Sequence, residues 1–339
     1  MLSILRKAAI AIALFFVFGV SSLYARPVPD SASGLDEHKV INVLDDLLVF
    51  WDQSKGMSPR RQRRAWARLV ENKHRDYFEK AVYQGADETE RRAMLDQFLL
   101  RIPWQIAAIR EFNKTAPELV EQGLLDFKSR FPEYIQTRDI YIAPSLFMFD
   151  GSVRPVQNEE RVPDTLCLGG DVLADYTAEQ FQMVIAHELF HLYHFSFLMR
   201  DTSPAEFTTG HMPLIIEGMA VAGTEAVYPY LPTSAYLHFS EDDLAAQQGD
   251  LIFSSRKFLK LLGDGATAAQ YASWFTNTAD QTVPPRGGYL LGYEVAKRLL
   301  ATYTMEQMVL LTPAQLREHV EEQLLEMASD NILVLAAAN

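Results

Sequence analysis

The sequence predicts an α+β protein that is mainly α-helical, with one small mixed sheet near its middle. Three observations support this fold class. Apolar residues recur at helical spacing over residues 35–130, and two short β-rich runs broken by Pro and Gly follow, "RDIYIAPSLFMFDGSV" and "DTLCLGGD". Helical spacing then returns in five segments: 177–200, 213–228, 241–262, 285–303 and 313–328. With 339 residues, 48% of them apolar, the chain can bury an ample core.

The first 25 residues differ from the rest. Arg6 and Lys7 precede an apolar run over residues 8–20, and "SSLYA" ends the segment. This layout is typical of a secretory signal cleaved after Ala25, and it predicts a periplasmic or secreted protein. The alternative is an uncleaved N-terminal membrane anchor, because the run is nearly long enough to span a bilayer. The sole cysteine, Cys167, cannot form an intramolecular disulfide, and we expect a buried free thiol.

We expect two regions after the signal, a helical N-terminal region over residues 26–130 and a second domain over residues 131–339. The net charge of −13 argues against nucleic acid as a partner. Residues 58–80 are the exception, with eight Lys or Arg against three Asp or Glu, on a helix expected to start with Ser58 as N-cap and Pro59 in the first turn. This basic 58–80 helix predicts either peripheral contact with an anionic envelope surface or acidic partner, or a solvated face beside acidic neighbours.

The segment "VIAHELFHLYHF" places polar residues in an apolar helix, and it contains the motif HExxH. Residues four apart share a helix face, so His187 and His191 can hold one Zn²⁺ ion together. Glu188 then lies beside the metal as the general base for a zinc-activated water. Thr177 and Gln180 form a candidate capping box at the start of this helix.

A catalytic zinc site needs a third protein ligand. The extended motif HExxHxxGxxH is absent, because His194 and Phe197 stand where it requires Gly and His. Glu217 lies in the apolar stretch "MPLIIEGMAVAGTEAV", where an ionised carboxylate is costly unless a cation pairs with it. Glu217 is therefore the predicted third ligand, and the alternative is that it faces water.

HExxH followed by Glu217-Gly218-Met219-Ala220 resembles the gluzincin-type zinc metalloproteases. With the later "GYLLGY" at residues 288–293, the chain most resembles a bacterial family of predicted zinc-dependent proteases, over about residues 131–330. The resemblance implies a zincin-like catalytic domain, with the HExxH helix beneath a small sheet whose edge strand holds the substrate. "TLCLGGD" is then the expected edge strand.

Tyr289 and Tyr293 are four residues apart on the "GYLLGY" helix, and related peptidases use a Tyr or His to donate a hydrogen bond to the oxyanion. Either tyrosine could do this, with Arg286 a weaker candidate, or the pair could simply pack against a neighbouring helix. Other candidates stay open. His194 is expected around the metal site rather than on the metal. His211 could reach the cleft, although a loop histidine more often has no such role. Three carboxylates could orient the ligand histidines: Asp171, Asp175 and Glu225.

The sequence thus predicts an exported zinc metallopeptidase that hydrolyses a peptide or protein substrate, with Zn²⁺ as its cofactor. One alternative function is a non-catalytic, zincin-like binding protein of the cell envelope. The other is an envelope interaction protein that acts through its basic N-terminal helices and in which HExxH occurs by chance. Neither the physiological substrate nor the oligomeric state follows from the sequence.

Overall fold

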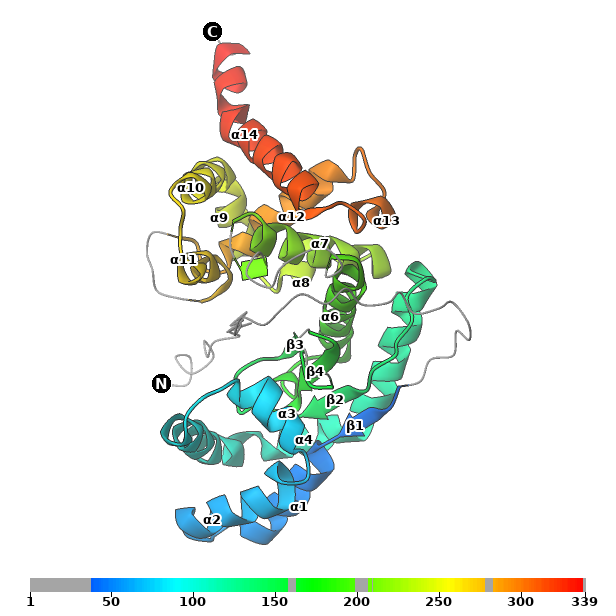
Figure 1. Cartoon of the computed structure of the whole chain (residues 1–339), viewed down its shortest axis with the longest axis vertical. Helices are drawn as coiled ribbons and strands as arrows, with labels where there is room; N and C mark the ends of the chain where they lie inside the picture. The colour runs from blue at the N-terminus through cyan, green and yellow to red at the C-terminus, as the bar shows by residue number, and fades with distance from the viewer. Residues whose placement is uncertain (1–37, 158–162, 199–206, 209, 278–282, 338–339) are drawn as a thin grey trace, which may run out of the picture. The chain divides into compact units, whose positions relative to one another are not determined.

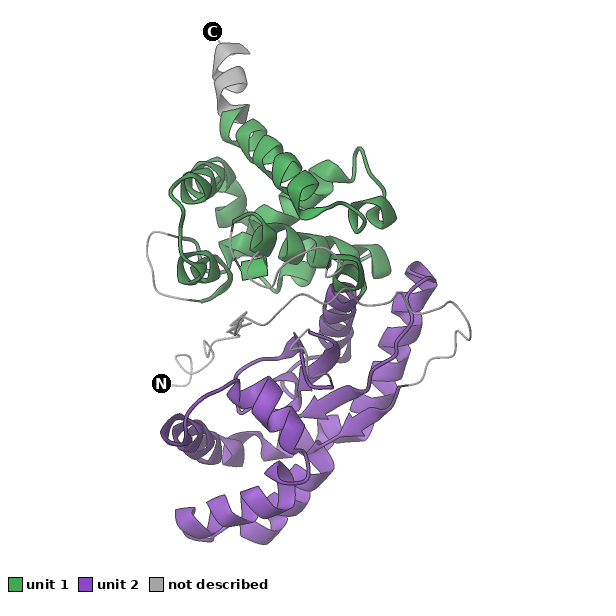
Figure 2. Cartoon of the chain, in the orientation of Figure 1, with its two compact units in different colours: residues 1–28, 193–339 green, residues 29–192 purple. Residues whose placement is uncertain are grey.

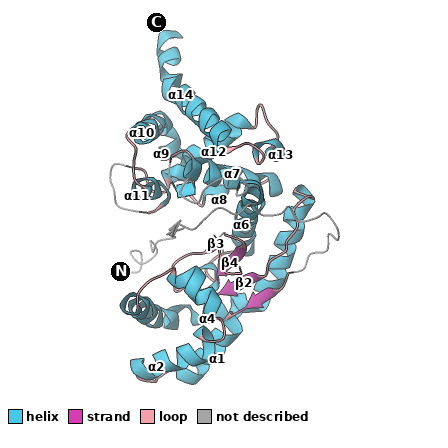
Figure 3. Ribbon diagram, in the orientation of Figure 1, coloured by secondary structure: helices cyan, strands magenta, loops and turns pink. Residues whose placement is uncertain are grey.

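The computed structural model describes residues 38–157, 163–198, 207–208, 210–277 and 283–337. They form a mainly helical α+β protein with one four-stranded sheet, which confirms the predicted fold class (Figures 1 and 3). The predicted signal, residues 1–25, lies outside the described residues. Among the helices described, none combines the length and the apolar character that crossing a membrane requires.

The chain divides into two compact units (Figure 2). The described residues up to 192 form one unit, called the first unit here after its place in the chain (purple, unit 2 in Figure 2). Those from 193 onward form the other, called the second unit (green, unit 1 in Figure 2). The division falls inside one continuous helix, α6 (Ala178–Leu198). The predicted boundary between the helical N-terminal region and the second domain, at residues 130 and 131, is not tested by this division and stays a prediction.

The sheet belongs to the first unit and has the strand order β1-β2-β4-β3. Strands β1, β2 and β4 are parallel to one another, and β3 pairs antiparallel with β4, so the sheet is mixed as predicted. The strands are β1 (Val40–Asn42), β2 (Ile140–Ala143), β3 (Gly151–Arg154) and β4 (Thr165–Gly169).

Two predictions about this sheet were wrong. Residues 40–42 were expected to be helical, but they form β1, because the amide of Val43 donates to the carbonyl of Ile142 (2.8 Å) and helix α1 begins only afterwards. A three-residue apolar run is too short for its period to distinguish strand from helix. The run "TLCLG" is an internal strand rather than the edge, and all five of its residues are buried. The edge strand next to it is β3.

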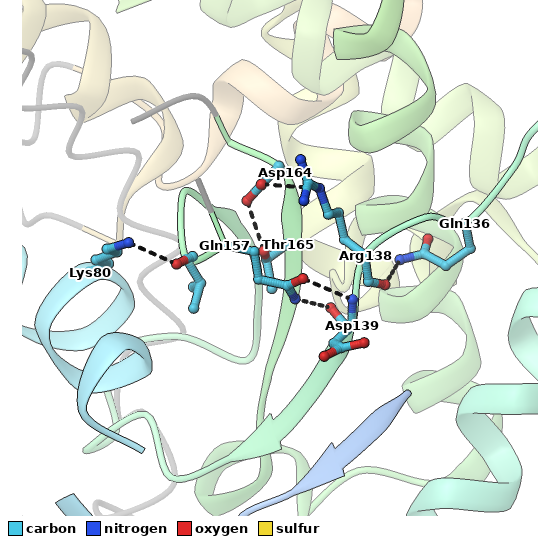
Figure 4. A network of polar contacts seen from close by, with 8 residues as sticks. Lys80, Gln136, Arg138, Asp139, Gln157, Asp164 and Thr165 are labelled. Carbon is cyan, nitrogen blue, oxygen red and sulfur yellow. Dashed lines mark hydrogen bonds and ion pairs between the residues drawn. The ribbon is translucent and has the colours of Figure 1, made fainter. Parts of the chain in front are cut away.

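A polar network fixes the end of the sheet where β2 and β4 begin (Figure 4). Gln157 exchanges two hydrogen bonds with the backbone of Asp139, at 3.3 and 3.1 Å. Arg138 pairs with Asp164 (3.5 Å), whose carboxylate also accepts from the hydroxyl of Thr165 (2.8 Å). The network therefore holds the segment after β3 to the starts of β2 and β4.

Short helices between β1 and α4 (Glu88–Arg130) in the chain pack around an aromatic cluster. Trp66 is fully buried, and its ring centroid lies 5.4 Å from Phe50, 5.5 Å from Phe78 and 5.2 Å from Phe98. Ser58 occupies the N-cap and Pro59 the first helical position, as predicted, but the predicted continuous 58–80 helix is interrupted. The elements are α1 (Leu44–Ser54), α2 (Pro59–Trp66), π-helix η1 (Ala67–Glu71), α3 (Arg75–Tyr77) and π-helix η2 (Phe78–Tyr83).

The longest helix of the first unit is α4 (Glu88–Arg130), which begins at a capping box between Asp87 and Glu90. It is followed by strands β2, β3 and β4 and by the short helix α5 (Gly170–Leu173), which leads into α6.

The second unit is built from helices, and its closest packing joins α7 (Met212–Val227) to α12 (Gly287–Leu299). A Cβ atom added at Gly218 would lie 2.1 Å from the carbonyl carbon and oxygen of Gly292. The predicted 241–262 helix is broken at Asp250, whereas the 213–228, 285–303 and 313–328 helices are confirmed. The remaining elements are α8 (Thr233–Leu237), α9 (Glu241–Gly249), α10 (Leu251–Gly263), α11 (Ala268–Ala272), η4 (Ser273–Phe275), α13 (Met305–Met308) and α14 (Pro313–Ala337).

Candidate metal centre

The helix that carries HExxH starts where the sequence predicted. The amide of Thr177 donates to Oε1 of Gln180 (2.9 Å), and the amide of Gln180 donates to Oγ1 of Thr177 (3.2 Å). These reciprocal bonds satisfy two amides that a helix start leaves without partners. The capping box is therefore confirmed, and α6 begins at Ala178.

Helix α4 supports α6 along the turns that lead to the motif. Phe181 packs edge-on against Phe112 with ring centroids 5.0 Å apart, and Phe190 packs against Phe131 at 5.6 Å. Between these pairs, Gly123 allows close contact, since a Cβ there would lie 2.9 Å from Cγ2 of Ile185. The metal-binding turns thus rest on a rigid helix–helix interface of the first unit.

His187 and His191 point their rings at a common place. Their Nε2 atoms lie 3.1 Å apart, and their ring centroids lie 4.7 Å apart with the planes at 86°. Two zinc–nitrogen bonds at a tetrahedral angle set the nitrogens about 3.3 Å apart, so the pair fits one zinc ion without rearrangement. Ligand atoms of Glu188 and the two histidines all lie within 4.8 Å of one another, and Glu188 is only 2% exposed.

Glu188 lies against the edge strand β3 at Gly151. A Cβ atom added there would lie 2.8 Å from Cγ and 3.1 Å from Oε1 of Glu188, and 2.6 Å from Cγ1 of Val184. Only glycine lets the strand approach the helix this closely. Gly151 was not predicted as a site residue, although a glycine within a short β-rich run is itself a signal of close backbone approach.

Arg154, at the other end of β3, is a second residue that the sequence analysis missed. Its side chain is almost fully buried. Burial lowers the pKa of the guanidinium, while the nearby Cys167 and Glu188 act to raise it. A buried arginine thus lies close enough to Glu188 for their charges to interact. Cys167 is a buried free thiol as expected, and burial raises its pKa well above the ordinary value.

Asp171 and Asp175 have structural partners in the first unit. The fully buried carboxylate of Asp171 accepts from the amide of Ser145 (2.6 Å) and the amide of Phe147 (2.6 Å). These bonds hold a loop in which Leu146 and Phe147 have φ angles of 57° and 60°, a region that L-residues rarely adopt. Asp175 accepts from Nε2 of Gln105 (2.7 Å). Both acids therefore support neighbouring chain segments.

Glu217 lies in the second unit and is 1% exposed, in a stretch of α7 that is buried from Met212 to Thr224. This burial excludes the alternative that Glu217 faces water. The adjoining Gly218 makes the backbone contact with Gly292, so the EG-x-A and "GYLLGY" motifs meet at a glycine–glycine crossing. The proposed coordination of zinc by Glu217 stays a prediction.

The two tyrosines of α12 have different surroundings. The hydroxyl of Tyr293 donates to Oε2 of Glu225 (2.8 Å), and burial together with this bond raises the pKa of Tyr293. Tyr289 is 1% exposed and packs edge-on against Phe275, while the Arg286 guanidinium carbon lies 4.8 Å from its ring centroid. Glu225 is thus engaged with a tyrosine of its own unit.

The two remaining histidine candidates also lie in the second unit. His194 is fully buried. Nε2 of His211 lies 2.9 Å from the carbonyl oxygen of Pro313, so this side chain is bound to the start of α14.

Comparison with known families identifies one match. A family model described as a predicted Zn-dependent protease (DUF2268) matches residues 130–317, which is more than half of the chain and includes all three motifs. No curated protein and no solved structure match the chain.

Proposed function

Since the chain belongs to the predicted Zn-dependent protease (DUF2268) family, we propose that it is an exported zinc-dependent peptidase with Glu188 as its general base. The observation that carries this proposal is the pair of imidazole nitrogens 3.1 Å apart, with the buried Glu188 carboxylate beside them. When bound there, zinc supplies Lewis-acid chemistry: it lowers the pKa of a water to about 7 and polarises the substrate carbonyl.

The residues of the chain supply the remaining steps. Glu188 accepts the proton of the attacking water and delivers it to the leaving amine. Glu217, as the third ligand, balances the metal charge and gives a reason for a carboxylate in an apolar helix. Tyr289 is a better candidate than Tyr293 for the oxyanion donor, because the hydroxyl of Tyr293 already donates to Glu225.

The edge strand β3 is the proposed place for the substrate backbone. β4 covers one of its edges, and no strand among the described residues pairs with the other. An extended peptide can add to such an edge through main-chain hydrogen bonds, with little demand on its sequence. The contact between Gly151 and Glu188 brings this edge next to the proposed base.

Export is proposed from the sequence alone, on Arg6, Lys7 and the apolar run before Ala25. Sequencing the N-terminus of the protein recovered from a bacterial envelope fraction should give Arg26 as the first residue. A retained Met1 would support the membrane anchor instead.

The proposed activity is tested by measuring zinc content and peptide hydrolysis on the same preparation. We expect one zinc per chain and cleavage of unstructured peptides. Glu188→Gln should retain the metal and lose activity by about 10²-fold or more, because the ligands remain while the base is lost.

One zinc per chain with no cleavage of a broad peptide library would favour the zincin-like binding protein. Near-native activity of Glu188→Gln would contradict the assigned mechanism. Absence of zinc would refute both functions.

A further inference from the structure

An apolar stripe covers one face of α4 and points to solvent. Leu100 is 67% exposed and Trp104 is 86% exposed, and both are large side chains that proteins usually cover. Pro103 and Ala107 are also exposed. These four positions follow the 3-4 spacing of a single helix face, so they form one continuous patch.

A cationic helix lies next to this stripe. Nη1 of Arg63 in α2 donates to Oδ1 of Asp96 in α4 at 2.7 Å, so the two helices meet at this ion pair. Leu100 is one turn along α4 from Asp96, and Arg60 is one turn along α2 from Arg63. The stripe on α4 and the arginines on α2 therefore both begin within one helical turn of the Arg63–Asp96 ion pair.

The arginines of this region are available to a partner. Four of them are exposed and form no ion pair with any residue in the described part of the chain: Arg60, Arg61, Arg64 and Arg68. Two acidic side chains of α4 and α1 are already paired with basic residues. Glu111 pairs with Lys114 (2.6 Å), and Asp52 pairs with Arg110 (3.0 Å). Residues 58–80 carry eight Lys or Arg against three Asp or Glu, so this region is positive although the chain as a whole carries −13.

We propose that this surface, the Leu100–Trp104 stripe with the α2 arginines, docks on an anionic lipid bilayer. Tryptophan is enriched at the depth of lipid headgroups, and surfaces that combine apolar and basic side chains bind in that zone. Arginine forms paired hydrogen bonds with phosphate, and each basic residue near an anionic bilayer strengthens attachment. This inference is independent of the proposed peptidase activity.

A local probe tests the proposal in the full chain. Cys167 is fully buried, so a cysteine introduced by Ala107→Cys can be labelled selectively with an environment-sensitive fluorophore. Tyr230→Cys, at a site that is 74% exposed in the second unit, is the matched control. We expect the Ala107 label to move to shorter emission wavelength with vesicles of phosphatidylglycerol and phosphatidylcholine, and the Tyr230 label not to move.

The fluorophore responds only to the surroundings of residue 107. Attachment of the chain to the vesicle through another segment would therefore leave its emission wavelength unchanged. No change at this position with the anionic vesicles would overturn the proposal and favour an acidic protein partner. An equal change with phosphatidylcholine alone would overturn the anionic requirement.

Substitutions separate the apolar contribution from the charge. Trp104→Ser should weaken vesicle binding, measured at the Ala107 probe, by about tenfold or more, because the large apolar side chain that enters the lipid is lost. Arg60→Gln and Arg64→Gln should each weaken it by about fivefold. The controls Phe253→Ser and Arg317→Gln alter exposed residues of the second unit and should leave the reading unchanged. If the controls weaken binding as much as the stripe and α2 variants, the surface is wrongly assigned.

Discussion

The glycine–glycine crossing between α7 and α12 gives the most quantitative prediction. In Gly218→Ala, the new methyl group would stand 2.1 Å from the carbonyl group of Gly292, about 1.3 Å short of the 3.4 Å at which ordinary contact begins. Both atoms it meets belong to the backbone, so no side-chain rotation can relieve the overlap. The helices must separate and lose packing on both sides of the crossing.

The expected cost follows from two opposing effects. Overpacking a well-packed core costs about 1–3 kcal/mol, and the rigid backbone contact favours the upper part of this range. Replacing glycine by alanine within a helix returns about 0.5–1 kcal/mol. We therefore expect Gly218→Ala to lower the free energy of unfolding by about 2 kcal/mol, which corresponds to a fall in Tm of about 4–8 °C for a unit of this size.

The assay is thermal unfolding followed by circular dichroism, with Gly263→Ala as the matched control. Gly263 ends α10, and a Cβ atom there meets nothing within 4 Å. This control should leave Tm unchanged or raise it slightly, because only the helix preference changes. If Gly218→Ala unfolds within about 1 °C of the unmodified protein, or if the control falls equally, the crossing does not limit the packing of these helices.

Three further predictions concern the site and the charges. Glu217→Ala should abolish tight zinc binding measured by metal analysis after dialysis, whereas Glu225→Ala should leave it intact; equal zinc retention in both variants would remove Glu217 from the ligand set. Tyr289→Phe should lower kcat with zinc content unchanged, and Tyr293→Phe should do so less; full kcat in both would make them packing residues. Burial acts to raise the pKa of Asp46, but hydrogen bonds from Lys73 and His74 outweigh it and hold the pKa below its ordinary value. A lowered pKa contributes stability above the unfolded value that is lost as pH falls through the folded value, so Asp46→Asn should lower the urea midpoint at pH 7 but not near about pH 2. A gap of equal size at both pH values would contradict this.

Local signals were sufficient for the elements that carry the chemistry. The capping box at Thr177 and Gln180 and the four-residue spacing of His187 and His191 depend only on helix geometry, so the sequence predicted both. The burial of Glu217 also followed from its neighbours, since a helical stretch that is apolar on all sides must be enclosed.

The tertiary structure decided what depends on partners distant in the chain. Residues 40–42 became a strand because β2, a hundred positions away, offered them an edge, and "TLCLG" became internal because β3 pairs beside it. The contact of Gly151 with Glu188 likewise depends on two segments that are distant in the chain, β3 and α6. Helix periodicity and capping act over a few residues and can be read from sequence, whereas strand order and glycine contacts are set by which distant segments pack together.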